Sequence, residues 1–327
     1  MPEATLDPRP AVQLLRRHPR VLVTSHASPD GDAIGSALGL AEFVAILGGE
    51  AQVVIRDPVS ANLQFLPGCE RITVVEALPE SMREAFDLAA VLECPGLDRP
   101  GLDSLDRWPI LNIDHHLGNP GYGVVNYLDE EAPAVGEMVL RMVECAGVAL
   151  TPALATNLYT ALVTDTGDFR YSNVTARAFG AAARLVEGGA VPYQIADALW
   201  EHTPARIVRL TAAVLATLAF AFDGRLATIT LDRATLDACG ALPEDTENLV
   251  NIPRSVDGVR VAAFFKALKA GTVKVSLRSR GDFDVEAVAR VFGGGGHTNA
   301  AGCTIHGSLD DARAAVSAAL RAALNNA

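Results

Sequence analysis

Residues 21–47 read VLVTSHASPDGDAIGSALGLAEFVAIL. The stretch opens with a short apolar run, Val21–Thr24, that predicts a buried strand, and it passes through a polar loop into a helix predicted over Asp32–Leu47. Gly48 and Gly49 then close the helix. Because a strand followed at once by a helix is the repeating unit of a parallel sheet, this stretch predicts an α/β fold.

The same alternation of strands and helices continues to about residue 189. Further strands are predicted at Ala51–Ile55, Asp87–Leu92 and Pro109–Ile113, and helices at Gly136–Cys145, Pro152–Val163 and Ala176–Val186. We therefore predict a first domain over residues 1–190, built on a parallel sheet with helices on both faces.

The pattern changes beyond residue 190. Residues 191–220 carry an apolar stripe at helical spacing and predict a helical connector. Residues 221–327 predict a smaller α+β domain, with strands at Leu226–Leu231, Val259–Phe265 and Val273–Leu277, and helices at Val285–Val291 and Leu309–Leu324. Ser308 and Asp311 predict a capping box at the start of the last helix.

Composition limits the partners of this chain. Its net charge of −12 argues against a long nucleic-acid groove, because such grooves gain affinity from many Lys and Arg side chains. A short anionic ligand is compatible with this charge if bound cations reverse the potential inside one cleft. The five cysteines are far apart and no apolar stretch is long enough to span a bilayer, so we expect a cytoplasmic protein that contacts no membrane.

The first group of chemically active residues is His26, Asp30 and Asp32, which lie between the first strand and its helix. Ligands of α/β proteins gather at the carboxyl ends of strands, so these side chains arrive together at a functional edge. One imidazole with two carboxylates suits manganese, magnesium or iron better than a closed zinc site. The structural alternative is a helix N-cap beside a surface histidine.

Two further segments place similar groups at comparable positions. Asp114, His115 and His116 follow the strand Pro109–Ile113. Asp165 ends an apolar helix, where the helix dipole disfavours a bare carboxylate and a bound cation would remove the penalty. A polar turn after the helix is the alternative for Asp165.

The smaller domain carries a run of four glycines, Gly293–Gly296, followed by His297. Consecutive glycines allow backbone N–H groups to cradle phosphate oxygens, and a flexible linker is the alternative. Arg278, near the end of a predicted strand, offers a guanidinium for bidentate phosphate binding, although a solvated surface charge fits this residue equally well.

These segments together resemble one family, the DHH phosphoesterases with their associated C-terminal domain, which include RecJ and the NrnA-like oligoribonuclease/pAp phosphatases. The resemblance covers nearly the whole chain. It rests on His26-x-x-x-Asp30-x-Asp32, Asp114-His115-His116, Asp165-Thr166-Gly167, and Gly293 to His297 with Ala300-Ala301-Gly302.

The resemblance implies a centre of two divalent metal ions, with Mn²⁺ expected and Mg²⁺ as the alternative. One ion would be held by His26 and Asp30, and the other by Asp32, His115 and Asp165. The resemblance further implies that His116 faces the scissile phosphate and that the opposite domain holds the substrate through Arg278, Gly294, Gly295, Gly296 and His297. In the mechanism we expect, Asp114 orients the loop and does not bind metal directly. A homodimer is also open, since relatives often pair through the first domain.

One position departs from the family pattern. A carboxylate that bridges the two metals is usually Asp, whereas the strand Asp87–Leu92 is followed here by Glu93. The extra methylene moves the carboxylate outward by roughly one C–C bond length, so we expect either a retreat of the strand or an altered metal pair. Asp98 is a weaker substitute because it lies well past the strand end.

The expected function is therefore metal-assisted hydrolysis of a phosphoester, in which two cations activate a water and neutralise charge on the phosphate. The resemblance points to RNA fragments of a few nucleotides and to 3′-phosphoadenosine 5′-phosphate. The alternatives are a cyclic dinucleotide or its linear product as substrate, and a nucleotide-binding sensor in which Glu93 has abolished catalysis. A pyrophosphatase is disfavoured, because the second domain has no recognisable lysine-rich phosphate clamp.

Overall fold

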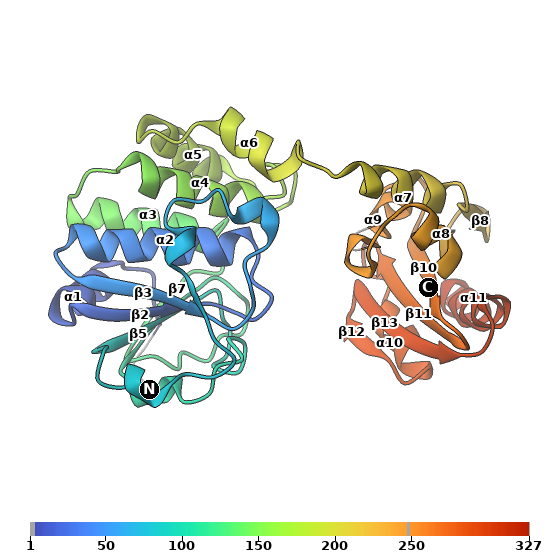
Figure 1. Ribbon diagram of the computed structural model, residues 1–327, viewed down its shortest axis with the longest axis horizontal. Helices are drawn as coiled ribbons and strands as arrows, with labels where there is room; N and C mark the ends of the chain where they lie inside the picture. Colours follow the sequence, from blue (N-terminus) through green and yellow to red (C-terminus); the bar gives the residue numbers. More distant parts are fainter. Residues whose placement is uncertain (1–3, 247–248, 327) are drawn as a thin grey trace. The chain divides into compact units, whose positions relative to one another are not determined.

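A computed structural model of the protein describes residues 4–246 and 249–326, and the chain divides into two compact units, Met1–His202 and Thr203–Ala327 (Figure 1). The boundary falls inside the segment 191–220, for which we predicted a helical connector. Helix α6 (Pro192–Trp200) belongs to the first unit and α7 (Ala205–Leu215) to the second. The helical pattern breaks between them where Thr203 precedes Pro204, a position that disfavours the helical conformation.

The first unit is a seven-stranded sheet in which every pair of neighbouring strands is parallel, in the order β1-β7-β6-β5-β2-β3-β4. Its strands are β1 (Ala4–Thr5), β2 (Arg20–Thr24), β3 (Glu50–Ile55), β4 (Thr73–Val74), β5 (Leu88–Leu92), β6 (Ile110–Asp114) and β7 (Val125–Leu128). Its other α-helices are α1 (Arg9–Arg17), α2 (Gly31–Ile46), α3 (Val135–Ala146), α4 (Pro152–Asp165) and α5 (Ala176–Glu187). The predicted parallel α/β fold is confirmed.

The two faces of this sheet are covered differently. One face packs against α2 and α3 in a large apolar core that includes Val21, Val23 and Leu92. The alternate residues of the same strands face a smaller core that includes Trp108 and Leu105, in which short 3₁₀ helices and loops supply the cover. The central strand β5 is buried along its whole length, which explains its unbroken apolar sequence.

Helix α2 packs closely against α4 because one side of α2 carries glycine at every fourth position, at Gly31, Gly35 and Gly39. A Cβ atom at Gly35 would lie 2.5 Å from the Asn157 carbonyl oxygen and 3.0 Å from Ala161 Cβ. Gly39 faces Leu158 in the same way. This contact places the start of α2 beside the end of α4.

The second unit contains a six-stranded sheet in the order β12-β13-β11-β10-β9-β8, in which only the β9 and β10 pair is parallel. Its strands are β8 (Ala219–Ala221), β9 (Leu226–Asp232), β10 (Val261–Lys269), β11 (Thr272–Ser279), β12 (Gly295–His297) and β13 (Ala300–His306). Its helices besides α7 are α8 (Arg233–Ala238), α9 (Asn251–Arg254), α10 (Val285–Val291) and α11 (Leu309–Asn326). Helices α10 and α11 pack on one face, and α7, α8 and α9 on the other.

Two local predictions in this unit need adjustment. The glycine run is not an open loop along its whole length, because Gly295–His297 forms the edge strand β12 through pairing with β13. Ser308 does cap α11, but its hydroxyl makes both bonds of the pair: Oγ accepts from the Asp311 backbone N–H (3.1 Å) and donates to the Asp311 carboxylate (2.6 Å).

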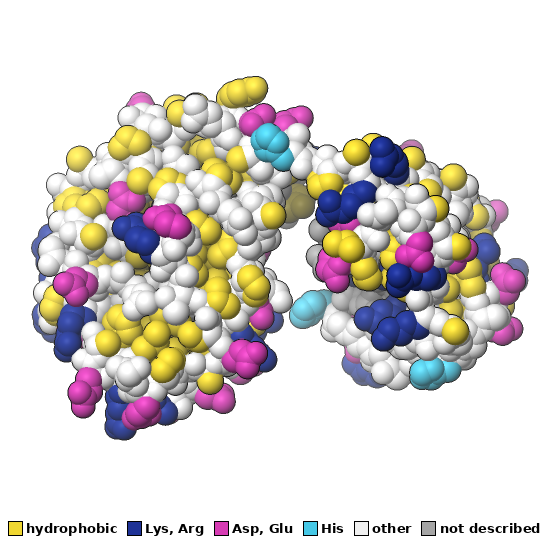
Figure 2. Space-filling view, viewed as in Figure 1, with side chains coloured by type: hydrophobic (Ala, Val, Ile, Leu, Met, Phe, Trp, Pro, Cys, Tyr) yellow, Lys and Arg dark blue, Asp and Glu magenta, His cyan; other side chains and the backbone are white. Residues whose placement is uncertain are grey.

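The surface carries charges of both signs. On the face shown in Figure 2, basic and acidic side chains are interspersed over each unit. Among the described helices, none combines the length and the apolar character needed to cross a membrane.

Candidate metal centre

The candidate centre lies at the carboxyl edge of the sheet, where β6, β5 and β2 end side by side. Each strand delivers a polar residue as it ends: His26 follows β2, Glu93 follows β5, and His115 follows β6. Asp32 enters from the first turn of α2, and Asp165 is the last residue of α4. The contacts below bring Glu93, His115, Asp32 and Asp165 together at this edge and place His26 beside Asp30.

His115 is the residue common to two clusters of possible ligand atoms. Its Nε2 lies 3.3 Å from Glu93 Oε1 and 3.8 Å from Asp165 Oδ2. Glu93, His115 and His116 form one group whose nitrogen and oxygen atoms all lie within 4.8 Å of one another, and Asp32, His115 and Asp165 form a second. Acidic oxygens and imidazole nitrogens this close together could hold a divalent cation.

His26 and Asp30 form a pair beside these groups. His26 Nε2 lies 3.8 Å from Asp30 Oδ1, and that same oxygen accepts from the Ala33 backbone N–H at 3.0 Å. Asp30 therefore is the N-cap of α2, as the structural alternative required, and still faces a histidine. Its charge also acts on Asp165, whose pKa it helps to raise.

All three imidazoles are held by their Nδ1 atoms. His26 Nδ1 lies 2.9 Å from the Ala27 carbonyl oxygen, His115 Nδ1 lies 2.9 Å from that of Ala132, and His116 Nδ1 lies 2.8 Å from Asp114 Oδ1. A proton on Nδ1 leaves the Nε2 lone pair facing the carboxylates, and this is the usual arrangement of metal-binding histidines.

Asp114 is held in turn by a residue that the sequence did not single out. Its carboxylate is buried, and its Oδ2 accepts from Asn119 Nδ2 at 2.7 Å. Ser36 was also missed: its hydroxyl donates to Asp32 Oδ1 at 2.6 Å. Ser36 could have been found, since it lies one helical turn after Asp32, whereas the irregular loop that carries Asn119 gave no signal.

The electrostatics of the centre favour a bound cation. Burial and then the Asp32 charge raise the pKa of Glu93 well above its usual range, and the same two causes raise the pKa of Asp165 to about 7. Burial alone would lower the pKa of His115, but its hydrogen bond to Glu93 and the Glu93 charge raise that pKa to about 11. The protein thus holds several acids close together in a site where burial weakens screening by water.

One buried oxygen supports this fit directly. Glu93 Oε2 is buried and has no hydrogen-bond partner among the described residues. A buried carboxylate oxygen left without a partner costs free energy, which coordination to a cation would offset. The donor set therefore fits divalent metal ions.

Glu93 has an unusual backbone conformation at the end of its strand. Strand β5 ends at Leu92, and Glu93 adopts a left-handed backbone conformation with φ of 60° while its N–H still bonds to the Ile113 carbonyl oxygen. Such a conformation is unfavourable for a non-glycine residue and is typical of functional sites. Asp98 joins neither ligand group among the described residues.

Two of the substrate-binding residues predicted in the second unit, Arg278 and His297, lie in one row across three strands, whereas Gly295 and Gly296 pair with other residues of β13. Arg278 on β11 lies opposite Ala300 on β13, which in turn lies opposite His297 on β12. Directly opposed residues of antiparallel strands point to the same face, so Arg278 and His297 share a face of the sheet. We call Arg278, Ala300 and His297 the Arg278 row.

Arg278 is a cation without an acidic partner among the described residues. It is half-buried, and its Nη1 donates only to the carbonyl oxygen of the adjacent Leu277 at 3.0 Å. Burial lowers the pKa of Arg278, and the nearby guanidinium of Arg254 lowers it further. Arg254 was not predicted, and two neighbouring cations of this kind suit an anionic ligand.

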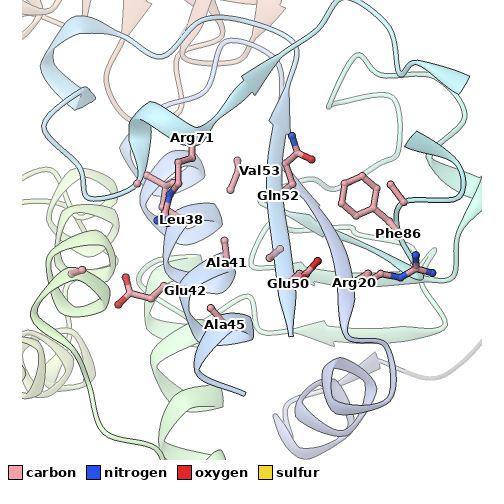
Figure 3. Close-up of a pocket in the computed structure, with 14 residues that line it drawn as sticks. Arg20, Leu38, Ala41, Glu42, Ala45, Glu50, Gln52, Val53, Arg71 and Phe86 are labelled. Atoms are coloured by element: carbon pink, nitrogen blue, oxygen red, sulfur yellow. The ribbon is translucent and has the colours of Figure 1, made fainter. Parts of the chain in front are cut away.

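A surface pocket lies elsewhere in the first unit, between β3 and α2 (Figure 3). It measures about 760 Å³, and none of the candidate ligands lines it. Its Arg20 is paired with Asp87, and its Glu42 accepts a hydrogen bond from Thr151. The chemistry therefore belongs to the strand edge and not to this pocket.

Imidazoles and carboxylates gathered at the carboxyl edge of a parallel sheet are compatible with the class of hydrolases that use metal ions on phosphate esters. Residues 20–162 match the DHH family, N-terminal domain, and residues 235–323 match the DHHA1 domain. The chain belongs to the DHH family of phosphoesterases.

Two curated relatives illustrate the range of this family. The chain is 37% identical over 310 residues to the bifunctional oligoribonuclease and PAP phosphatase NrnA of Thermus thermophilus, covering 94% of this chain and 91% of the relative. It is 27% identical to the cyclic-di-AMP phosphodiesterase GdpP of Geobacillus thermodenitrificans, covering 88% of this chain but only 45% of that protein.

Solved structures share the fold. An exopolyphosphatase-related protein from Bacteroides fragilis superposes with a TM-score of 0.86 at 26% identity, over 96% of this chain and 95% of the other. RecJ from Thermus thermophilus, solved in complex with Mn²⁺, gives a TM-score of 0.51 at 15% identity, over 98% of this chain and 56% of RecJ. The second likeness shows the fold alone.

Proposed function

We propose that this protein hydrolyses short oligoribonucleotides and 3′-phosphoadenosine 5′-phosphate with the help of two divalent cations, Mn²⁺ in the first place and Mg²⁺ as the alternative. The residues that would hold the cations are His26, Asp30, Asp32, Glu93, His115 and Asp165. The observation that carries the proposal is the pair of ligand groups that share His115. The choice of substrate is supported by the extent of the likeness to NrnA.

The bound cations would supply an activated water and neutralise charge on the phosphate. The contribution of His116 follows from its hydrogen bond: because Asp114 holds Nδ1, His116 presents Nε2, which accepts a proton when neutral and donates one when charged. In its charged form, His116 Nε2 can donate a hydrogen bond to a phosphate oxygen. Asp114 is proposed as the residue that orients the His116 ring, with Asn119 fixing Asp114.

In the second unit we propose that Arg278, Gly294, Gly295, Gly296 and His297 bind the substrate. Arg278 and His297 share one face, and Arg254 lies close enough to act on Arg278. Two guanidiniums can neutralise a few phosphate charges but not a long strand, and the net charge of −12 points the same way. This supports a substrate of a few nucleotides.

A substrate panel tests the proposal. Purified protein with Mn²⁺ is incubated with pApA, a short RNA oligomer, 3′-phosphoadenosine 5′-phosphate and cyclic di-AMP, and the products are separated by chromatography. We expect cleavage of the first three. If all four bind and none is cleaved, the protein is a nucleotide-binding sensor and the proposal is wrong.

The substitution Glu93→Asp distinguishes an active enzyme from a sensor that has lost catalysis. In an active enzyme with Glu93 as a bridging ligand, this substitution should change activity only modestly, and metal analysis should find two ions per chain. A sensor would hold fewer than two ions, and Glu93→Asp would create activity in it. Asp98→Asn is the matched control, since Asp98 joins neither ligand group among the described residues.

Cyclic di-AMP is kept as a second candidate substrate because one relative is named for that activity. Preferential cleavage of cyclic di-AMP over pApA would favour it. A cytoplasmic location and a homodimer remain predictions, and light scattering on the purified chain tests the second.

A further inference from the structure

The segment Ala132–Gly136 comprises the end of the loop before α3 and the first two residues of α3, and its backbone touches two of the candidate ligands. The Ala132 carbonyl oxygen lies 2.9 Å from His115 Nδ1. The backbone N–H groups of Val135 and Gly136 donate to the two oxygens of Asp32, at 2.6 and 2.9 Å. Five consecutive residues thus orient an imidazole from β6 and a carboxylate from α2.

Asn173 ties this segment to a third ligand. Its Nδ2 lies 3.1 Å from the Pro133 carbonyl oxygen, 3.2 Å from the Asp165 carbonyl oxygen and 3.4 Å from Asp165 Oδ2. Three oxygens surround this nitrogen, so the amide must present its N–H groups to them. Asn173 Oδ1 is buried without a partner among the described residues, which indicates that the amide is held for its donors.

The same segment is anchored on its far side by a buried ionic network. Arg177 on α5 donates to Glu137 Oε1 at 2.9 Å and to Asp129 Oδ2 at 2.8 Å, so it spans both ends of the segment. Arg141 also donates to Asp129 Oδ2, at 2.9 Å. Both carboxylates are almost fully buried. The anchor is therefore formed by charges that water screens only weakly.

We propose that Asn173 is a positioning residue for the metal centre: its amide fixes the Asp165 carboxylate relative to the Ala132–Gly136 segment, so that Asp32, His115 and Asp165 are set as one unit. The proposal rests on the proposed function, because it presumes that these three residues bind metal. Asn173 touches no reacting atom in this scheme. It acts through Asp165 and Pro133, and Arg177 keeps the segment in place.

The chain offers a matched control for Asn173. Asn157, on α4, is also an asparagine whose Nδ2 donates to a proline carbonyl oxygen, that of Pro67 at 3.1 Å, and whose Oδ1 is buried without a partner among the described residues. Asn157 contacts none of the candidate ligands through a described hydrogen bond. Its loss should affect folding but not metal geometry.

The test measures Mn²⁺ binding to the metal-free full-length chain by titration calorimetry, alongside its melting temperature without metal. We expect Asn173→Ala to weaken Mn²⁺ binding by about 10- to 100-fold. Asn173→Asp, which has nearly the same shape but turns an acceptor toward three oxygens, should weaken it at least as much. Asn157→Ala should lower the melting temperature and leave Mn²⁺ affinity within about twofold of the wild type.

The outcomes separate the two proposals. Wild-type protein that binds no Mn²⁺ contradicts the proposed function and, with it, the role of Asn173. Tight binding by the wild type and equally tight binding by Asn173→Ala overturns the positioning role alone. Equal weakening by Asn157→Ala and Asn173→Ala also overturns it, because the effect would then follow from stability in general.

Discussion

The candidate metal centre and the Arg278 row differ in how firmly their side chains are held. At the centre, each histidine is fixed by its Nδ1 atom, and Asp32 accepts from two backbone N–H groups and a hydroxyl. In the row, the one acceptor of Arg278 among the described residues is the neighbouring carbonyl oxygen, and His297 is exposed on an edge strand.

The difference matches the demands of the two tasks. Metal ligands must meet within a few tenths of an ångström, so their orientations are fixed before any ion arrives. Groups that bind the charged part of a flexible substrate gain from being free to adjust. The first unit should therefore respond to substitutions with loss of chemistry, and the second with loss of affinity.

The largest effect should follow the loss of His115, which belongs to both ligand groups. His115→Ala should reduce kcat/KM by more than about 1,000-fold, equivalent to about 4 kcal/mol of transition-state stabilisation. His202→Ala is the control, since His202 is exposed and paired with Asp197. Steady-state kinetics with pApA measures both, and residual activity near the wild-type level in His115→Ala would remove the centre from the chemistry.

The next largest effect should be on stability, and it should differ between two arginines that link α5 to α3. Arg177→Gln leaves nearly buried Asp129 and Glu137 carboxylates with fewer partners and should lower the free energy of unfolding by about 3 kcal/mol. Arg184→Gln breaks only the partly exposed pair with Glu144 and should cost under about 1 kcal/mol. Urea unfolding at pH 7 measures both, and equal losses would contradict the special role of Arg177.

The stability that Arg177 provides should depend on pH through its partner Asp129. Burial acts to raise its pKa, but the hydrogen bond and charge of Arg177 lower it below the ordinary value of 3.8. The contribution to stability is therefore present above pH 3.8 and is lost as the pH falls through the lower folded-state pKa. The difference in the free energy of unfolding between wild type and Arg177→Gln, measured with urea, should therefore become smaller below about pH 4. A difference that does not change with pH would contradict this role of Asp129.

Removal of the metal ions should lower the melting temperature of the first unit alone. Mn²⁺ at 100 times its dissociation constant stabilises the native state by about 2.7 kcal/mol, and a unit of this size then melts about 5 to 10 °C higher. In differential scanning calorimetry, EDTA should lower the transition of the first unit and leave that of the second unchanged. A parallel shift of both would place metal ligands in the second unit as well.

The smallest effect should come from the Arg278 row. Arg278→Ala should raise KM about 10- to 150-fold and leave kcat within a few-fold, because a hydrogen bond to a charged group contributes about 1.5 to 3 kcal/mol. Lys274→Ala on the same strand is the control, since Lys274 lies at an even spacing from Arg278 and is exposed. A fall in kcat with constant KM would instead assign Arg278 to the chemical step.

The strands that carry the site could be predicted because they are buried on both sides, which makes their sequences unbroken apolar runs. Strands β1 and β7 were missed. β1 has two residues, and β7 carries Asn126 in its centre, where the amide is satisfied by Asn112 and Gly123. Strand β12 was missed because glycine has low strand propensity, and only its pairing with β13 makes it a strand.

The ligand types could be predicted from their positions at strand and helix ends, since the topology of a parallel sheet brings those ends together. The residues that hold the ligands could not. Asn173 reaches Asp165 and Pro133 only because α5 folds back beside α3, and no spacing in the sequence encodes that approach. The conformation of Glu93 was likewise not apparent from its residue type.

The absent side chain of Gly35 carries a last consequence. Because the Asn157 carbonyl oxygen leaves no space for even one methyl group, a side chain at this position would push α2 away from α4. Asp32 lies one turn before Gly35 and Asp165 ends α4, so the spacing of these two acids depends on the close contact. Gly35→Ala should therefore separate the start of α2 from the end of α4 and move Asp32 away from Asp165.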